Sequence, residues 1–239
     1  MNIFNFFKKN PKVIFWNSVP GLEEVNPPVP AIECIPEWFK KMPQDITEYF
    51  SGHPGTLKRC PGFVDFYKEG YVLKLWCDLY VKINEDRTYE VQSPEKNFKF
   101  IVHLDNQFLD HIPDRNTFSA VLKGHNPWRI KTPKGWSVMQ LPMFYDFNKT
   151  FTVLPGSIWT DIHHEINPQI AFYSTGEFFI PRGTPLAVYI PYKRQKIKYE
   201  ISALTEKLKK LEDVAYFWFA SKFRGGYKDH QNKIKRDKS

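Results

Sequence analysis

The chain has 239 residues, a length that allows one large domain or one domain with extensions. Hydrophobic residues make up 42% of the sequence and aromatic residues 17%, which is enough to fill a sizeable core. The formal net charge of +8 suits weak attraction to nucleic acid or an acidic surface, or basic ends that keep the protein soluble.

The cysteines and the apolar runs exclude several classes of protein. Cys34, Cys60 and Cys77 are odd in number and form no C-x-x-C pair, which argues against a disulfide scaffold or a zinc site. No run approaches the ~20 apolar residues of a membrane span. The opening MNIFNFFKKNPK has its charges after its apolar part, the reverse of a secretory signal. We therefore expect a soluble, intracellular protein with no membrane partner.

The first 59 residues show no sustained hydrophobic period. The stretch NSVPGLEEVNPPVPAIECIPEWFKKMPQ predicts an extended, proline-rich arm, because proline is excluded from helix interiors and central strands. One short helix is expected near Glu37 to Lys41. Trp16, Trp38 and Phe39 are expected to anchor the arm in grooves of its own domain, with a partner's surface as the alternative.

Residues 60–192 carry the pattern of a β domain. In GYVLKLWCDLYVKI, residues 70–83, alternate positions are apolar, which predicts one long strand with a single face toward the core. The inward set is Tyr71, Leu73, Leu75, Cys77, Leu79, Val81 and Ile83. Further short strands are expected at 87–93, 98–103, 128–132, 136–142, 151–156, 170–175, 177–181 and 186–191. Short strands separated by Gly, Pro and Asn turns predict a mainly β fold, a β-sandwich or a barrel-like core.

The pattern becomes helical near the C-terminus. Ile201, Leu204, Leu208, Leu211 and Ala215 recur at helical spacing with charged residues between them, which predicts one amphipathic α-helix. This helix is expected either to pack on the sheet or to pair with a copy of itself. The last residues, 224–239, are polar and basic and are expected to form a mobile tail.

Two short stretches contain the ligand types of an iron site. The triplet HLD supplies His103 and Asp105, and HHE supplies His163 and His164 as candidates for a further ligand. Two histidines and a carboxylate form the facial triad that holds Fe(II) and leaves positions open for oxygen and a keto acid. Arg182 is the candidate partner of the 2-oxoglutarate carboxylate. On a β-sandwich this set resembles the Fe(II)/2-oxoglutarate-dependent oxygenases. The alternative is that His103 is an ordinary half-buried histidine.

A basic cluster precedes the predicted helix and consists of Lys193, Arg194, Lys196 and Lys198. Tyrosines lie at both ends of this cluster, a pattern that suits contact with nucleic acid or an acidic surface. The alternative is a solvated segment at the start of the helix.

Residues 133–191 contain an ordered set of turns and strands: PKGWSVMQLP, FTVLPGSIWTDIHHEI and GEFFIPRGTPLAVYIP. Their order, P-x-G-aromatic, then G-x-I-x-x-D, then apolar-x-x-G-x-x-apolar-A, resembles the dUTPase and dCTP deaminase family, whose core is a β-clip. The resemblance implies a tight turn at Gly183, where a positive φ is needed, and a buried strand that begins at Leu186 and Ala187. It also implies a homo-oligomer, with the homotrimer as the expected form.

The departures from that family concern its catalytic groups. Where the family keeps its catalytic aspartate this chain has Trp159, and the family's Arg-Ser motif falls near Met143 and Phe144. A chain without the water-activating carboxylate cannot perform that hydrolysis by the same mechanism. The resemblance therefore implies the fold without the activity. Asp161 is expected to cap its loop rather than to replace the missing carboxylate.

A longer part of the chain resembles an uncharacterised family of tailed-phage proteins. The resemblance includes CPGFVDFYKEGYVLKLWCD and the stretch from GTP to IPYKRQ, and it covers most of the length. It implies a viral origin but brings no known activity and no site residues.

These observations predict four parts: an arm at 1–59, a β domain at 60–192, an amphipathic helix at 193–223 and a basic tail at 224–239. The expected function is that of a non-catalytic phage-type protein that binds, as a virion component or through a host factor. No cofactor is expected, and the expected location is the virion or the host cytoplasm. The alternatives are an Fe(II)/2-oxoglutarate-dependent oxygenase and a nucleotide-binding relic of a dUTPase-like fold.

Overall fold

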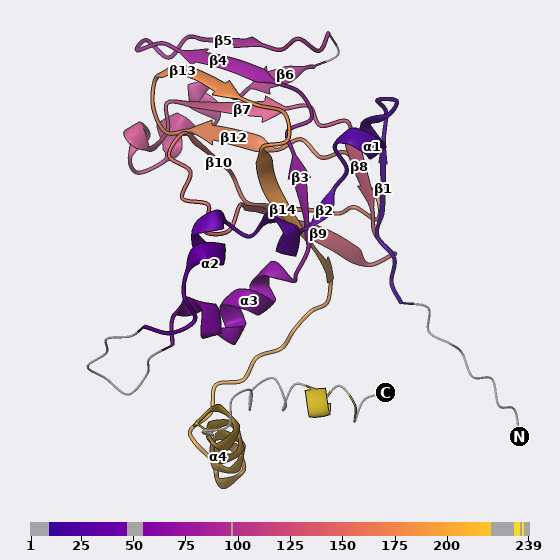
Figure 1. Cartoon of the computed structure of the whole chain (residues 1–239), viewed down its shortest axis with the longest axis vertical. Coiled ribbons are helices and arrows are strands. Elements are labelled where there is room, and N and C mark those ends of the chain that lie inside the picture. The colour runs from indigo at the N-terminus through magenta and orange to yellow at the C-terminus, as the bar shows by residue number, and fades with distance from the viewer. Residues whose placement is uncertain (1–9, 47–54, 97, 221–231, 235, 237–239) are drawn as a thin grey trace, which may run out of the picture. The chain divides into compact units, whose positions relative to one another are not determined.

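The computed structural model describes residues 10–46, 55–96, 98–220, 232–234 and 236. These residues form a mainly β protein with one long helix near the C-terminus, as the sequence predicts (Figure 1). The chain divides into two compact units, Met1–Lys41 with Tyr67–Arg194, and Met42–Phe66 with Gln195–Ser239. Among the described helices, none combines the length and apolarity needed to cross a membrane.

Antiparallel pairing builds four sheets in the first unit. The five-stranded sheet has the order β11 (Gly156–Ile158), β9 (Trp136–Pro142), β14 (Pro185–Lys193), β3 (Tyr71–Lys74), β2 (Val29–Pro30). The four-stranded sheet has the order β10 (Phe151–Val153), β12 (Gln169–Phe172), β7 (Ala120–Gly124), β6 (Phe100–Val102). The three-stranded sheet has the order β13 (Gly176–Ile180), β4 (Leu79–Ile83), β5 (Tyr89–Gln92). A two-stranded sheet joins β1 (Ile14–Asn17) to β8 (Trp128–Lys131).

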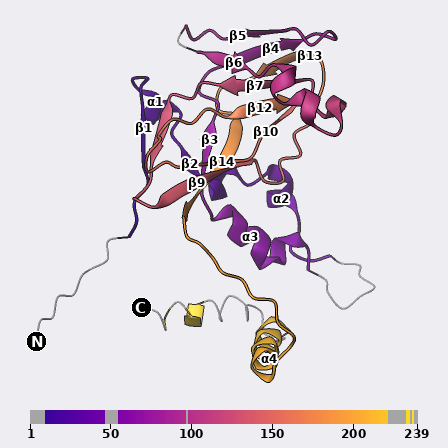
Figure 2. The ribbon, with the colours of Figure 1, turned by 180° about the vertical axis from the view of Figure 1, so that it is seen from behind.

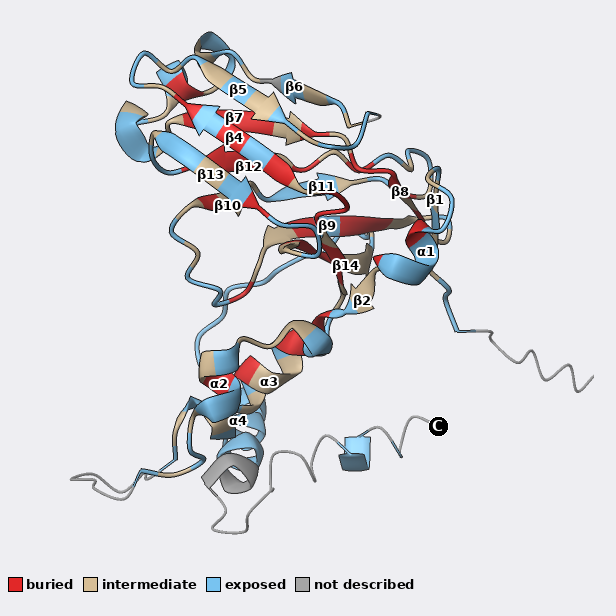
Figure 3. Cartoon of the chain, turned by 45° about the horizontal axis from the view of Figure 1, so that its top comes forward, coloured by how far each residue is buried: buried red, intermediate tan, exposed pale blue. Residues whose placement is uncertain are grey.

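One large hydrophobic cluster connects these sheets. It includes Leu73 of β3, Ile83 of β4, Leu122 of β7, Ile130 of β8 and Phe172 of β12, each at most 2% exposed. In Figures 1 and 2 the strands of the three- and four-stranded sheets gather at one end of this unit, and β3, β9 and β14 lie at the other. Buried positions run along β7, β9 and β12 in Figure 3.

The stretch 70–83 is two strands rather than the single strand predicted. The chain leaves the five-stranded sheet after β3 and enters the three-stranded sheet at β4. At the break, Leu75 N–H donates to Thr184 O at 2.8 Å, and Leu75 O accepts from Asn26 Nδ2 at 2.9 Å. Six of the seven residues predicted to face inward are at most 2% exposed: Leu73, Leu75, Cys77, Leu79, Val81 and Ile83. The prediction of a single buried face is wrong, however, because Val72 at 0% and Trp76 at 5% are buried as well and Tyr71 is only half-buried.

The turn before β14 is formed as the resemblance implies. Gly183 has a φ of 87°, in the left-handed region that favours glycine. Leu186 and Ala187 are buried, and β14 pairs with β9 on one side and β3 on the other. This strand is therefore the centre of the five-stranded sheet.

Part of the proline-rich arm is built into the sheets. Strand β1 pairs with β8, and β2 pairs with β3. Helix α1 (Leu22–Val25) lies between these two strands, and helix α2 (Glu37–Lys41) occupies the predicted helical stretch. Phe39 is 5% exposed, and Trp38 Nε1 donates to Tyr145 O at 3.0 Å, so both side chains contact the arm's own unit.

The second unit contains a helix that the sequence did not predict. Helix α3 (Pro61–Tyr67) begins in this unit and ends at its boundary, where a β pattern was expected. Helix α4 (Glu206–Ala220) confirms the predicted C-terminal helix but starts later than residue 193 or 200. Thr205 Oγ1 accepts from Leu208 N–H at 3.3 Å and caps its start. Of the predicted tail at 224–239, only 232–234 and 236 are among the described residues.

Candidate functional site

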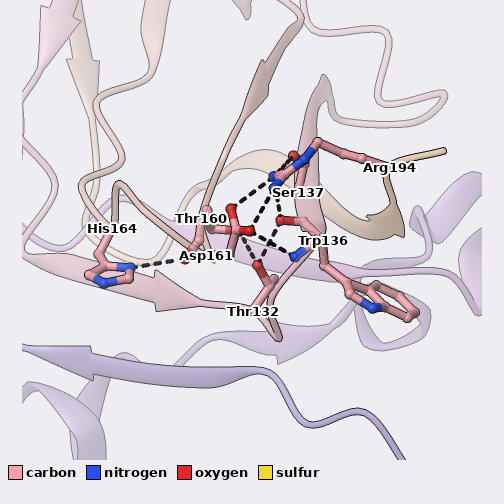
Figure 4. Close-up of polar contacts among 8 residues, drawn as sticks. Thr132, Trp136, Ser137, Thr160, Asp161, His164 and Arg194 are labelled. Atoms are coloured by element: carbon pink, nitrogen blue, oxygen red, sulfur yellow. Dashed lines mark hydrogen bonds and ion pairs between the residues drawn. The ribbon is translucent and has the colours of Figure 1, made fainter. Parts of the chain in front are cut away.

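The candidate site lies where three strands of the five-stranded sheet end. Lys193, the last residue of β14, is paired with Trp136 at the start of β9. Ile158, the last residue of β11, is paired with Val138 of β9. The residues that follow β14 and β11 are therefore brought together at one end of the sheet, as Figure 4 shows for Asp161 and Arg194.

Asp161 and Arg194 form a bidentate ion pair. Arg194 Nη1 donates to Asp161 Oδ1 at 2.8 Å, and Nη2 donates to Oδ2 at 2.6 Å. Gly135 N–H donates to the same carboxylate at 2.8 Å. The hydrogen bonds from Arg194 lower the pKa of Asp161 to about 2; burial opposes this effect, and the hydrogen bond from Gly135 adds to it. The pair is closed, because only 6% of the Asp161 side chain and 22% of the Arg194 side chain are exposed.

The Arg194 guanidinium also joins this pair to the sheet and to an indole ring. Its Nη1 donates to Trp136 O at 2.7 Å and to Ser137 Oγ at 2.8 Å (Figure 4). Its guanidinium carbon lies 4.1 Å from the centre of the Trp159 ring, a cation–π contact. Trp159 is 55% exposed and Ile162 is 70% exposed. The ion pair with Asp161 therefore fixes the Arg194 guanidinium, which lies against the exposed Trp159 ring and supports it.

A second polar chain fixes the loop that carries Asp161. The hydroxyls of Thr132 and Thr160 lie 2.8 Å apart, and Thr132 Oγ1 donates to Trp136 O at 3.2 Å. His164 Nδ1 lies 2.9 Å from Thr160 O (Figure 4). Since a carbonyl oxygen only accepts, Nδ1 carries the proton. Both threonines are buried. The hydrogen bonds of Thr160 and His164 therefore fix the loop on both sides of Asp161.

This geometry suits binding better than acid–base chemistry. A carboxylate whose pKa is about 2 and whose oxygens accept from Arg194 and Gly135 is a weak base at neutral pH. The expectation that Asp161 caps its loop agrees with its hydrogen bond from Gly135. The role of Arg194 as its partner was not foreseen, because the two residues are 33 positions apart in sequence.

Of the residues proposed as an iron site, Asp105 and His164 are engaged in other contacts, and His103 Nε2 is buried with no hydrogen-bond partner among the described residues. Asp105 forms an ion pair with Arg115 and lies 3.9 Å from Arg87 Nη1. His164 uses Nδ1 on backbone carbonyls, and His163 is exposed. Across the described ranges, no group of three or more His, Cys, Asp or Glu is arranged to hold a metal ion. The described residues therefore do not bring the proposed facial triad together, and its carboxylate is paired with arginine instead.

Arg182, the candidate partner of 2-oxoglutarate, and the members of the basic cluster lie in different surroundings. Arg182 is exposed, and its backbone N–H donates to Asp78 Oδ1 at 2.7 Å. Within the cluster, Lys193 is exposed, but the Arg194 guanidinium forms an ion pair with Asp161. Lys196 and Lys198 belong to the second unit and are exposed there.

Comparisons with known proteins return solved structures but no family. No protein-family model matches the sequence, and no curated protein is similar to it. The EIAV dUTPase matches at 10% identity over 56% of this chain and 83% of that chain, with a TM-score of 0.33. A mutant dUTPase of Staphylococcus bacteriophage 80alpha matches at 10% identity over 58% and 85%, with a TM-score of 0.34. A mutant dUTPase from phage phi11 of S. aureus matches at 9% identity over 56% and 84%, with a TM-score of 0.32. At these values the matches carry no argument about the site.

Proposed function

We propose that this chain is a phage-type protein that works by binding a partner protein, in the virion or on a host factor, rather than by catalysis. The observation that carries the proposal is the exposed indole of Trp159, supported from beneath by the Arg194–Asp161 ion pair. The viral setting is supported by the resemblance of the sequence to tailed-phage proteins.

The Trp159 surface has the properties of a binding hot spot. Tryptophan and arginine are enriched among the residues that dominate binding energy at interfaces. The support costs no reorganisation on binding, since Arg194 is already held by Asp161, Trp136 O and Ser137. Ile162 lies three residues further along, donates its backbone N–H to Trp159 O at 3.0 Å, and is also an exposed apolar residue.

The proposal is tested by substituting Trp159 and measuring partner capture. The tagged full-length chain, Trp159→Ala and Phe179→Ala are each incubated with lysate from phage-infected cells and with purified virions, and captured proteins are quantified. Phe179 is the matched control because it is also an exposed aromatic residue, at 53%, on another sheet. We expect one protein to be captured by the wild type and by Phe179→Ala.

Binding of that protein should weaken about 30-fold in Trp159→Ala, the loss that corresponds to ~2 kcal/mol at a hot spot. Equal capture by all three proteins would show that Trp159 is not the binding site. Turnover of dUTP or dCTP by the purified protein would contradict the non-catalytic part.

A nucleotide-binding function is the second candidate. Exposed indole rings stack with bases, and the exposed Lys193 adds a positive charge beside the site. The discriminating measurement is the melting temperature with 1 mM dUTP or dCTP. Under the leading proposal neither nucleotide changes it. A nucleotide-dependent rise in melting temperature that disappears in Trp159→Ala would show that the site binds a nucleotide rather than a partner protein.

A further inference from the structure

The loop between β9 and β10 has an unusual backbone. Tyr145 and Phe147 have φ values of 52° and 54°, and they flank Asp146. Non-glycine residues adopt this region rarely, and such residues concentrate at ligand sites when the surrounding structure holds them there. Within the described ranges only one other non-glycine residue, Arg87, has a positive φ.

Contacts from Trp38 and Tyr67 and a hydrogen bond within the loop hold it in place. Trp38 Nε1 donates to Tyr145 O at 3.0 Å, and its ring centre lies 5.7 Å from that of Phe147. Tyr67 Oη donates to Phe144 O at 2.7 Å. Asn148 Oδ1 accepts from the backbone N–H of Thr150 at 2.8 Å. The conformation of the loop is therefore fixed before any ligand arrives.

The loop borders a cavity of about 260 Å³. Its lining includes four aromatic residues, Tyr145, Phe147, Phe151 and Tyr173, and Asp146 is its acidic residue. Pockets for drug-sized ligands measure roughly 300–1,000 Å³. This cavity instead suits one amino-acid side chain or a small organic ion.

The charge of this cavity lacks a partner. In the part of the chain that the structure describes, the Asp146 carboxylate has neither a hydrogen bond nor an ion pair. The residue is exposed at the mouth of the cavity, and partial burial of its carboxyl group raises its pKa. Aromatic rings present a negative face that attracts organic cations. A cation in the cavity would pair with the carboxylate and contact the rings at the same time.

We propose that the cavity beside Asp146 binds a guanidinium or alkylammonium group, as carried by an arginine or lysine side chain. Charge complementarity selects the cation, and the volume limits it to a single side chain. The site is independent of the Trp159 surface, because it shares no residue with it.

The test measures binding of blocked amino acids by saturation-transfer NMR with the full-length protein. The probes are Nα-acetyl-arginine amide, Nα-acetyl-lysine amide and Nα-acetyl-citrulline amide, the last being a neutral isostere of arginine. We expect the two cations to bind at least tenfold more tightly than the citrulline compound. Equal binding of the citrulline compound, or no signal from either cation at 10 mM, would overturn the proposal.

Variants assign the binding to this cavity. Asp146→Asn should weaken cation binding about tenfold, and Phe147→Leu about threefold through loss of the ring. Glu177→Gln and Trp159→Ala should leave it unchanged, since these residues lie outside the cavity. Unchanged binding in Asp146→Asn would refute the site. Thermal melting separates unfolding from lost binding, because removal of a partly desolvated charge should leave Asp146→Asn at least as stable as the wild type.

The source of the cation is resolved by a further probe, methylguanidinium chloride. Tighter binding of the blocked arginine than of methylguanidinium would assign the site to a side chain of a partner chain. Equal affinity would assign it to a small free cation. Both outcomes support the cationic specificity of the cavity.

Discussion

Asp161 and Arg194 show how the surroundings of a charged pair decide its importance. Lys82 and Glu177 also form an ion pair, at 3.6 Å, but their side chains are 45% and 79% exposed. Exposed pairs of this kind contribute little because water and salt screen them. The Asp161 carboxylate is nearly closed off from solvent and accepts a hydrogen bond from a backbone N–H as well. Its negative charge therefore contributes to the stability of the folded protein.

Removal of the Asp161 charge should destabilise the protein in a pH-dependent manner. The folded pKa of about 2 lies below the ordinary value of 3.8, so the ionised form is stabilised by folding. This contribution is fully present above pH ~4 and is lost as the pH falls through about 2. The melting temperature of Asp161→Asn should therefore lie several degrees below that of the wild type at pH 7, and the gap should close between pH 4 and pH 2.

The control for this prediction is Glu177→Gln, which should change the melting temperature by less than about 1 °C at any pH. A gap between Asp161→Asn and wild type that stays constant down to pH 2 would show that the carboxylate is not held in its ionised form.

At the scale of elements, β14 determines how the five-stranded sheet is built. It pairs with β9 over seven positions and with β3 on its other edge. The register shifts between Pro185 and Ala187, a bulge at the strand's start, where Pro185 provides no N–H. Two glycines with positive φ serve this strand: Gly183 in the turn before it, and Gly70 before its neighbour β3.

Three glycine-to-alanine substitutions should separate the cost of a positive φ from the cost of a steric clash with the added Cβ. Gly183→Ala should cost about 1–2 kcal/mol, because its φ is 87° but nothing lies within 4 Å of an added Cβ. Gly70→Ala should cost more than about 2 kcal/mol, since its φ is 78° and the Cβ would lie 2.6 Å from Tyr189 O. Gly156→Ala should be close to neutral, because it has open space and no positive φ. Urea unfolding of the three variants measures this order, and an equal cost for Gly70 and Gly183 would contradict it.

At the scale of the whole molecule, the proposed binding role includes self-association. The homotrimer expected from the sequence stays a prediction, and the exposed Trp159 at the end of the five-stranded sheet is a surface on which a partner, including a second copy, would find an anchor.

Light scattering after size-exclusion chromatography tests this assembly. We expect a mass of about 85 kDa, three times the 28.3 kDa of one chain. A monomer of about 28 kDa at micromolar concentration would contradict the trimer but leave the Trp159 surface as a site for a different protein. A trimer that dissociates in Trp159→Ala and persists in Phe179→Ala would identify the partner as a further copy of the chain.

Some features follow from local rules and were predicted from the sequence. Alternating apolar residues place Leu79, Val81 and Ile83 in the core wherever the strand ends, because successive side chains point to opposite faces. Helical spacing with charges between predicts α4, and the glycine turn predicts the positive φ of Gly183. Strand β7 was missed because both of its faces are buried and its sequence does not alternate.

The sequence alone therefore determined the mainly β class, the inward face of β4 and the C-terminal helix, since these depend on the spacing of residues a few positions apart. Tertiary structure decided the rest. It divided the stretch 70–83 between two sheets, brought Arg194 onto Asp161, paired Asp105 with Arg115, and left Asp146 in an aromatic cavity. Each of these outcomes depends on which strand ends meet in space, and pairing of strands far apart in sequence leaves no short-range pattern to read.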